Sequence, residues 1–164
     1  MSDTTRFLPR RELGRTGFMA TVLGSGDLAD RSVPFATCVA TLRRAIDAGL
    51  NVIDTAPGYE DGYSEQIVGA AVQGVRDRLF VISKIDDLEA PVAPQIEASL
   101  QRLGLAYTDA FVFHGLSSLA TLERLMQPGG GFEQLRDCIR GKTRFGGISS
   151  HDPDVLRVAI EAGL

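Results

Sequence analysis

The sequence predicts an α/β fold of the (β/α)8 TIM-barrel type, in which parallel strands alternate with helices. Runs that are apolar throughout alternate with amphipathic segments, which is typical of strands covered by helices. These runs end 30, 30 and 35 positions apart, at Asp54, Lys84, His114 and Ser149. Eight such units give roughly 250 residues, the usual length of a barrel. A chain of 164 residues is therefore predicted to be a partial barrel of about five units.

The first two units contain the clearest helical periodicity. A strand at 21–26 (TVLGSG) precedes a helix at 35–49, which Gly49 is suited to end. Strand LNVID follows, and then a helix over 64–75 with Ser64 as candidate N-cap. The apolar stripe of the first helix recurs every three or four positions and consists of Phe35, Val39, Leu42 and Ile46.

The remaining units repeat this order. The predicted elements are a strand at 79–84, a helix at 91–103 ending before Gly104, a strand at 109–114, helices at 118–127 and 131–141, a strand at 144–149, and a helix that Asp152 and Pro153 begin. Right-handed crossovers predict that the five strands are neighbours in sequence order. Residues 1–164 are thus interpreted as the N-terminal portion of a single barrel domain.

Composition excludes several classes of protein. A net charge of −4 and a pI near 5.2 argue against nucleic-acid binding and against a basic membrane-surface protein. No apolar stretch approaches the ~20 residues that span a bilayer, and the first residues lack the apolar centre of a signal peptide. Cys38 and Cys138 have no metal-type spacing, so we expect no metal site and reduced thiols in a cytoplasmic protein.

Titratable side chains gather where the strands end. The carboxyl ends of parallel barrel strands share one face, which would bring together Asp54, Tyr59, Lys84 and His114. A phenol titrates near pH 10, and an ammonium beside it stabilises the phenolate form. A carboxylate would hold the ammonium in place, and an imidazole would orient a substrate oxygen. A lone lysine at a strand end is usually solvated and a lone histidine there more often bonds a loop, but the four residues together predict a tuned proton donor.

These residues resemble the aldo/keto reductases, barrel oxidoreductases that use a nicotinamide cofactor. The segment NVIDTAPGYEDGYSEQIVG is similar to the family signature that leads from an aspartate to the catalytic tyrosine. The resemblance covers residues 11–164 and begins with a segment similar to an N-terminal hairpin that closes the bottom of the barrel. It implies that Tyr59 is the proton donor, although Tyr63 competes for the role. Asp54, Lys84 in VISK and His114 in FVFHG would complete a catalytic tetrad.

The same resemblance implies residues that bind NADP(H), with NAD(H) also possible. In FGGISSHD, Ser149 matches a serine that holds the nicotinamide carboxamide, while Ser150 stands where asparagine is commoner. Gly26 and Asp27 match a stretch that runs close to the cofactor, and Asp54 lies beside it. Gly24 and Gly26 are equally compatible with a plain turn.

This chain departs from the family pattern in one respect. The resemblance implies that the sixth to eighth strands of the family bind most of the dinucleotide, and those strands are not in this sequence. We therefore expect a chain with the proton-transfer half of the site that is weak or inactive alone. The predicted function is an NADP(H)-dependent carbonyl reductase or alcohol dehydrogenase that acts on a small carbonyl or alcohol. The alternatives are a non-catalytic binding or regulatory module, against which the intact tetrad speaks, and an inactive fragment that lacks the cofactor half of the site. The substrate and the oligomeric state cannot be predicted from the sequence.

Overall fold

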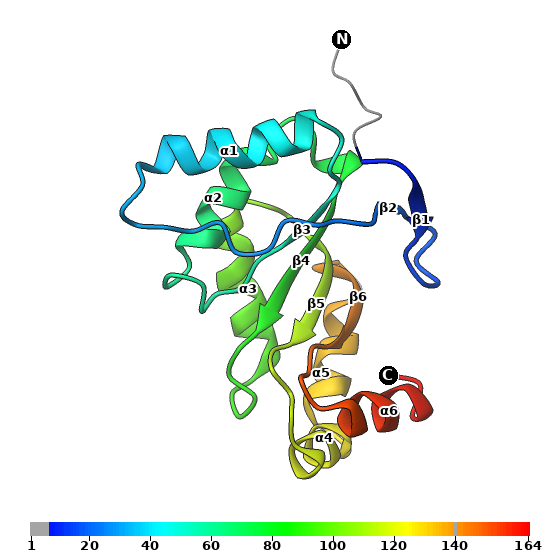
Figure 1. Ribbon diagram of the computed structural model, residues 1–164. Coiled ribbons are helices and arrows are strands. Elements are labelled where there is room, and N and C mark those ends of the chain that lie inside the picture. Colours follow the sequence, from blue (N-terminus) through cyan, green and yellow to red (C-terminus); the bar gives the residue numbers. More distant parts are fainter. Residues whose placement is uncertain (1–6, 140) are drawn as a thin grey trace.

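A parallel sheet of four strands forms the centre of the computed structural model, which describes residues 7–139 and 141–164 (Figure 1). The strands are neighbours in sequence order, as the strand–helix rhythm predicts. Their bounds are Val52–Asp54 for β3, Phe80–Ile85 for β4, Thr108–Phe113 for β5 and Thr143–Ile148 for β6. All three pairings are parallel, which confirms a partial barrel.

The helices lie close to their predicted ranges. They are α1 (Phe35–Asp47), α2 (Tyr63–Ala71), α3 (Val92–Leu103), α4 (Leu119–Met126), α5 (Gly131–Cys138) and α6 (Pro153–Glu161), with a 3-10 turn at Arg76–Arg78. Asp152 caps α6 as predicted, because its carboxylate accepts from the backbone N–H of Asp154 and Val155. None of the helices in the described ranges is both long and apolar enough to cross a membrane.

Two details of the first helices differ from prediction. The buried stripe of α1 consists of Cys38, Leu42 and Ile46, while Phe35 is exposed at the start of the helix and packs on the Tyr63 ring. Ser64 is not the N-cap of α2, because left-handed Gly62 precedes the helix and Tyr63 begins it. The Ser64 hydroxyl is buried instead and accepts a hydrogen bond from the Thr55 hydroxyl at 2.9 Å.

The segment predicted as the first strand, 21–26, does not form one strand: Thr21 ends an antiparallel hairpin strand, and Ser25 makes one parallel bridge with Ile53. Its position beside β3 agrees with the predicted order. The Asn51 side chain, however, makes hydrogen bonds to this segment where a regular strand would pair through its backbone. The Asn51 amide accepts from Thr21 N at 2.7 Å and donates to Met19 O at 2.9 Å. Glycines on both sides of Ser25 further weaken a regular strand.

An antiparallel hairpin of β1 (Arg10–Glu12) and β2 (Met19–Thr21) precedes the sheet, as the resemblance implies. The Phe18 ring lies 5.3 Å from the ring of Phe80, the first residue of β4. Phe80 in turn stacks on Phe145 near the start of β6, at 6.0 Å. The hairpin therefore packs at the end of the sheet where the strands begin, opposite the strand ends at Asp54 and Lys84.

The core lies between the sheet and its helices in two clusters. One surrounds Ile53, Val81 and the apolar faces of α1 and α2. The other surrounds Phe111, Phe113 and the apolar faces of α3 to α6. Strand residues alternate between this helix-covered side and the opposite side, so neighbouring positions have different environments.

A buried carboxylate joins the beginnings of three strands. Asp109 accepts from the backbone N–H of Val81 at 2.8 Å. It also pairs with Arg76 at 2.8 Å and with Arg144 at 3.0 Å. These contacts lie at the end of the sheet opposite the strand ends that carry the candidate site, where a barrel uses its residues for stability.

Helices α2 and α3 approach most closely at Gly69. A Cβ atom added there would lie 2.1 Å from the backbone oxygen of Leu103, which cannot move without disturbing the end of α3. We therefore expect Gly69→Ala to lower the free energy of unfolding by about 1–3 kcal/mol, measured by urea denaturation. Gly141→Ala is a suitable control, because a Cβ there meets nothing within 4 Å. Equal stability of both variants would contradict the close packing of α2 on α3.

Candidate functional site

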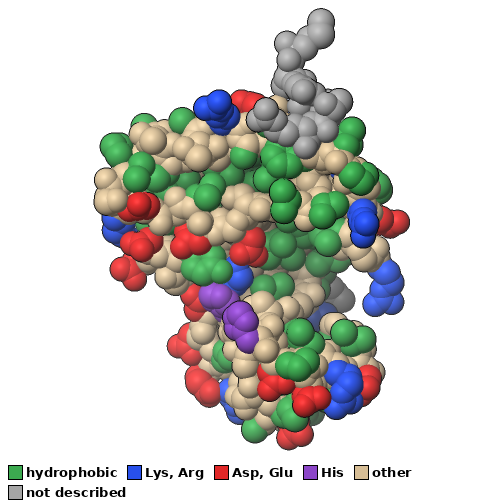
Figure 2. All heavy atoms as spheres, viewed as in Figure 1, with side chains coloured by type: hydrophobic (Ala, Val, Ile, Leu, Met, Phe, Trp, Pro, Cys, Tyr) green, Lys and Arg blue, Asp and Glu red, His purple; other side chains and the backbone are tan. Residues whose placement is uncertain are grey.

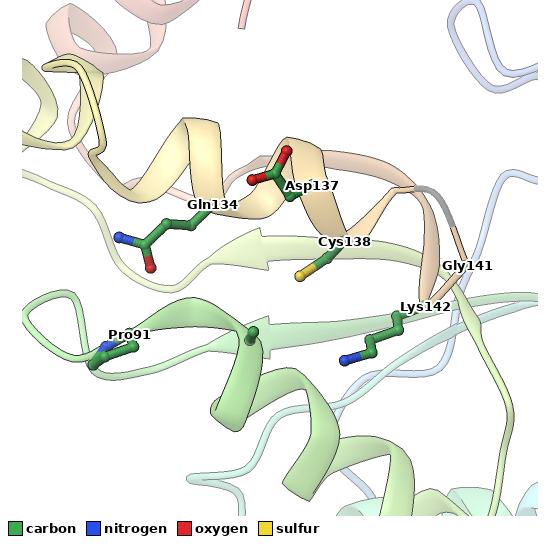
Figure 3. A pocket seen from close by; sticks show the side chains of 7 residues that line it. Pro91, Gln134, Asp137, Cys138, Gly141 and Lys142 are labelled. Atoms are coloured by element: carbon green, nitrogen blue, oxygen red, sulfur yellow. The ribbon is translucent and has the colours of Figure 1, made fainter.

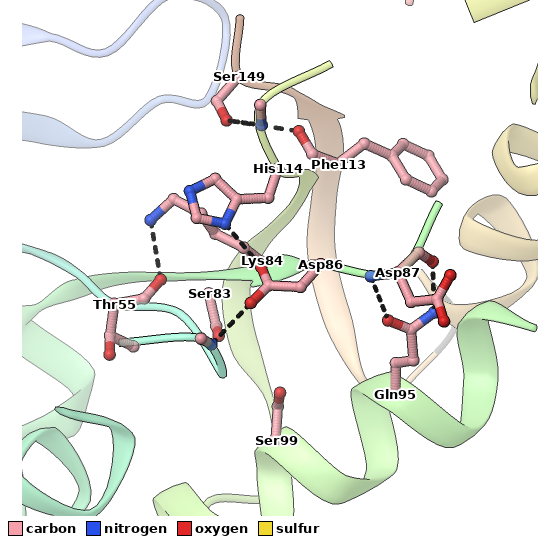
Figure 4. Close-up of polar contacts among 12 residues, drawn as sticks. Thr55, Ser83, Lys84, Asp86, Asp87, Gln95, Ser99, Phe113, His114 and Ser149 are labelled. Carbon is pink, nitrogen blue, oxygen red and sulfur yellow. Dashed lines mark hydrogen bonds and ion pairs between the residues drawn. The ribbon is translucent and has the colours of Figure 1, made fainter. Parts of the chain in front are cut away.

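The ammonium of Lys84 is fixed at the carboxyl end of the sheet. Ser83 faces α2 and bonds Glu65, so Lys84 points to the opposite side of β4. Lys84 Nζ donates to the Asp54 carboxylate. It also donates to the backbone oxygen of Thr55 at 2.9 Å (Figure 4). Lys84 is 5% exposed, so both contacts form where water has little access.

The register between β3 and β4 explains why the Asp54 and Lys84 side chains are in contact. Asp54 pairs with Ile82, so Lys84 lies two residues further along its strand. The long lysine side chain spans this stagger and reaches back to the carboxylate. The two residues that the sequence places at consecutive strand ends thus lie in direct contact.

The structure brings Tyr59 to this pair. Lys84 Nζ lies 4.7 Å from the centre of the Tyr59 ring. The same ring meets the His114 ring edge to face, with 5.6 Å between centroids and 81° between planes. Tyr63 has other neighbours, since its ring packs on Phe35 at 5.7 Å and on the Arg31 guanidinium at 4.9 Å.

A turn in an uncommon backbone conformation holds Tyr59 above the strand end. Glu60 and Asp61 have φ angles of 49° and 51°, and Gly62 follows at 80°. Non-glycine residues in this region cost of order 1–3 kcal/mol each and cluster at functional sites. Arg31 supports the turn by donating to the Glu60 backbone oxygen at 2.6 Å. The chain thus reverses directly after Tyr59 and enters α2.

Asp86 is a site residue that the sequence analysis missed. Its Oδ1 lies 2.6 Å from His114 Nδ1, and its Oδ2 accepts from the backbone N–H of Gly58 at 2.6 Å. Asp86 follows Lys84 by two positions, and the alternation along a strand would have placed it on the same side. Its partners, which are 28 positions away in both directions, could not be predicted from that alternation.

The residues expected to bind the cofactor lie at the same end of the sheet. Ser149 follows β6, accepts from Gly115 N at 3.1 Å and donates to Phe113 O at 3.4 Å. The Ser150 hydroxyl accepts from Asp152 N at 2.9 Å. Gly26 and Asp27 follow the Ser25 bridge, and Asp27 accepts from Ala29 N at 2.8 Å. Both serine hydroxyls are therefore engaged within the chain.

The histidines lie at the margin of a hollow in which apolar side chains are visible, with acidic side chains gathered on one side (Figure 2). A cavity of about 380 Å³ lies between α3 and α5 (Figure 3). Cys138 points into it, and burial raises the pKa of this thiol, which keeps it protonated at neutral pH. Cys38 and Cys138 are both free and buried. The described residues contain no cluster of three side chains suited to hold a metal ion.

Known proteins resemble this chain in sequence. A model of the aldo/keto reductase family matches residues 20–163. The methylglyoxal reductase YeaE of Escherichia coli is 39% identical over 119 residues, which cover 71% of this chain and 40% of that protein. The NADH-specific methylglyoxal reductase of E. coli is 28% identical over 173 residues, which cover 92% and 52%.

Solved structures share the fold. An aldo/keto reductase from Klebsiella pneumoniae in complex with NADP and acetate superposes with a TM-score of 0.73 at 32% identity. The match covers 85% of this chain and 49% of that one, so the chain spans about half the length of the relatives it matches. With the parallel sheet, the hairpin and the family match over residues 20–163, the chain belongs to the aldo/keto reductase family.

Proposed function

We propose that the chain carries the proton-transfer residues of an NADP(H)-dependent oxidoreductase that interconverts a small carbonyl compound and an alcohol. The observation that supports this most is the meeting of Tyr59, Lys84, Asp54 and His114 at three consecutive strand ends. In this proposal Tyr59 protonates the substrate oxygen during reduction and accepts the proton back during oxidation. The free, buried thiols support a cytoplasmic location.

The neighbours of Tyr59 suit a proton donor. Loss of its proton leaves a phenolate, and the nearby Lys84 ammonium stabilises that negative charge. Asp54 and the Thr55 backbone oxygen hold the ammonium in place, so no reorganisation is needed when charge develops. His114 lies against the Tyr59 ring, where its imidazole can hydrogen-bond and orient the substrate oxygen.

A bound nicotinamide cofactor would supply the hydride for this reaction. Ser149 fits a carboxamide, because its hydroxyl has two acceptor lone pairs and accepts one bond from Gly115 N. Ser150, Gly26, Asp27 and Asp54 would border the same group. The K. pneumoniae relative is in complex with NADP and an E. coli relative is NADH-specific, so we propose NADP(H) with NAD(H) as the second possibility.

Turnover tests the proposal against a non-catalytic module or an inactive fragment. The assay follows NADPH absorbance with methylglyoxal, the aldehyde in the names of two E. coli relatives. It uses the 164-residue chain and a chimera, here called the completed barrel, in which the C-terminal half of the K. pneumoniae reductase follows Leu164. Reduction by the completed barrel that depends on Tyr59 would support an enzyme. A folded completed barrel that binds NADPH without turnover would favour the non-catalytic module.

We expect the 164-residue chain alone to bind NADPH about 10²–10⁶-fold more weakly than the completed barrel. The relatives it matches are about twice as long, and the family resemblance attributes most of the cofactor contacts to the later strands. Two or three charged hydrogen bonds to phosphates, at ~1.5–3 kcal/mol each, account for this difference. Titration of both proteins with NADPH, followed by cofactor fluorescence, measures it. Micromolar binding by the short chain as a monomer would contradict this prediction.

A further inference from the structure

We propose that Asp86 is a positioning residue, which uses one carboxylate to set both the His114 imidazole and the turn that carries Tyr59. This inference rests on the proposed function, since it concerns two residues assigned to that reaction. Nothing in the tetrad itself requires a carboxylate at this position. Asp86 contacts two groups of the site, His114 and the Gly58 backbone, and it fills the space beside Gly58.

The two oxygens of Asp86 serve different parts of the site. Oδ1 lies 2.6 Å from His114 Nδ1, and Oδ2 accepts from Gly58 N at 2.6 Å. Gly58 directly precedes Tyr59, so this second bond anchors the turn immediately before the tyrosine. An ionised carboxylate can only accept hydrogen bonds, so Nδ1 must carry a proton. Figure 4 shows that the other ring nitrogen, Nε2, points away from Asp86. The contact thereby fixes both the tautomer and the orientation of the ring.

Gly58 supports the same assignment independently. A Cβ atom added at Gly58 would lie 2.5 Å from Asp86 Oδ2, too close for any real contact. The backbone of Gly58 does not have the positive φ that favours glycine. A side chain at position 58 would therefore displace the Asp86 carboxylate from its present place.

Asp87 shows how an ordinary loop carboxylate differs. Its Oδ1 accepts from the backbone N–H of Glu89 at 2.9 Å and of Ala90 at 3.1 Å, within its own loop. Asp86 instead bonds residues that follow two other strands, β3 and β5. Asp87 is thus a matched control for loss of one negative charge from the same loop.

The test replaces Asp86 by asparagine, which has one acceptor oxygen in place of two. The oxygen of the new side-chain amide can accept from Gly58 N, but the NH₂ group then faces His114 Nδ1 and requires an unprotonated nitrogen. We expect ¹⁵N NMR in mildly alkaline buffer to show the Nδ1–H tautomer of His114 in the unsubstituted 164-residue chain and Nε2–H in Asp86→Asn. His151, the other histidine, is the internal reference, and Asp87→Asn should leave the His114 tautomer unchanged.

The activity arm uses the completed barrel. Asp86→Asn should lower kcat for NADP⁺-dependent oxidation of the alcohol formed from methylglyoxal about 10–100-fold while the KM for NADP⁺ stays constant, because Nε2 then carries the proton and no longer accepts from the substrate hydroxyl. Gly58→Ala, which displaces the carboxylate without removing it, should have a similar effect. Asp87→Asn should retain full activity.

Two results would overturn the inference: an unchanged His114 tautomer in Asp86→Asn, or a changed tautomer with undiminished kcat. Near-UV circular dichroism establishes that each variant is folded, and Gly58→Ala tests the same contact should Asp86→Asn fail to fold. Absence of turnover in the unsubstituted completed barrel would instead refute the proposed function. The NMR comparison would still decide whether Asp86 sets the Nδ1 proton.

Discussion

Replacing Tyr59 by phenylalanine is expected to lower kcat for aldehyde reduction about 10²–10⁴-fold in the completed barrel, without weakening NADPH binding. The substitution removes the hydroxyl and keeps the ring, which packs against Lys84 and His114. The geometry of the site is therefore preserved while its proposed proton donor is lost. Steady-state kinetics and a fluorescence titration with NADPH separate these two effects.

Tyr63→Phe is the matched control, since it removes a phenol hydroxyl from the other tyrosine of this segment, four positions after Tyr59. Tyr63 packs against Phe35 and Arg31, so its loss should leave kcat within about twofold. A loss of turnover in Tyr63→Phe, with activity retained in Tyr59→Phe, would move the proton donor to the second tyrosine. Retained turnover in both variants would place proton transfer elsewhere.

Replacing Asp109 by alanine is expected to lower the free energy of unfolding by about 3–5 kcal/mol. The change leaves the guanidinium of Arg76, 12% exposed, without its carboxylate, and it leaves Val81 N without its acceptor. Arg144 contributes less, because its side chain is 54% exposed and water replaces the lost contact. Urea denaturation of the 164-residue chain measures the effect.

Glu97→Gln is the control for Asp109→Ala. Glu97 also pairs with a basic residue, Lys142, but both side chains are substantially exposed. This pair raises the pKa of Lys142, mainly through its hydrogen bond. Its removal should leave the free energy of unfolding nearly unchanged, because water replaces the contact of an exposed pair. If both variants lose the same stability, burial of Asp109 is not what makes its contacts important.

The strand order could be predicted because it depends on the regular alternation of strands and helices along the sequence. Each parallel strand needs a crossover, and the handedness of that crossover leaves one arrangement for consecutive units. The reduced first strand could not be predicted in the same way. From the sequence, Asn51 is predicted to lie at the start of the next strand. Its side chain instead hydrogen-bonds the backbone of Met19 and Thr21, and the pattern of apolar residues cannot predict such a bond.

That the four predicted catalytic residues lie close together could be inferred from strand ends, whereas the residues that contact them could not be predicted. Asp86 has the correct alternation, but its role depends on Gly58 and His114, which tertiary structure alone brings near. Glu65 is a second case, because a glutamate at the start of a helix is normally solvated. Here it is fully buried and bonds Ser83 and Arg102, 18 and 37 positions later.

The order of the strands also has a consequence for cooperativity. Val52 pairs with Phe80 and Thr108 with Thr143, 28 and 35 positions later, so each strand of the sheet pairs with its neighbours in sequence. Such a chain behaves like a linear array, in which the stability of each unit depends mainly on its contacts with the units next to it. Amide hydrogen exchange should then be slowest in β4 and β5, which have partners on both sides, and faster in β3 and β6. Lys84 would lie on one of the two strands that exchange most slowly, and the Tyr59 turn would follow one of the faster ones.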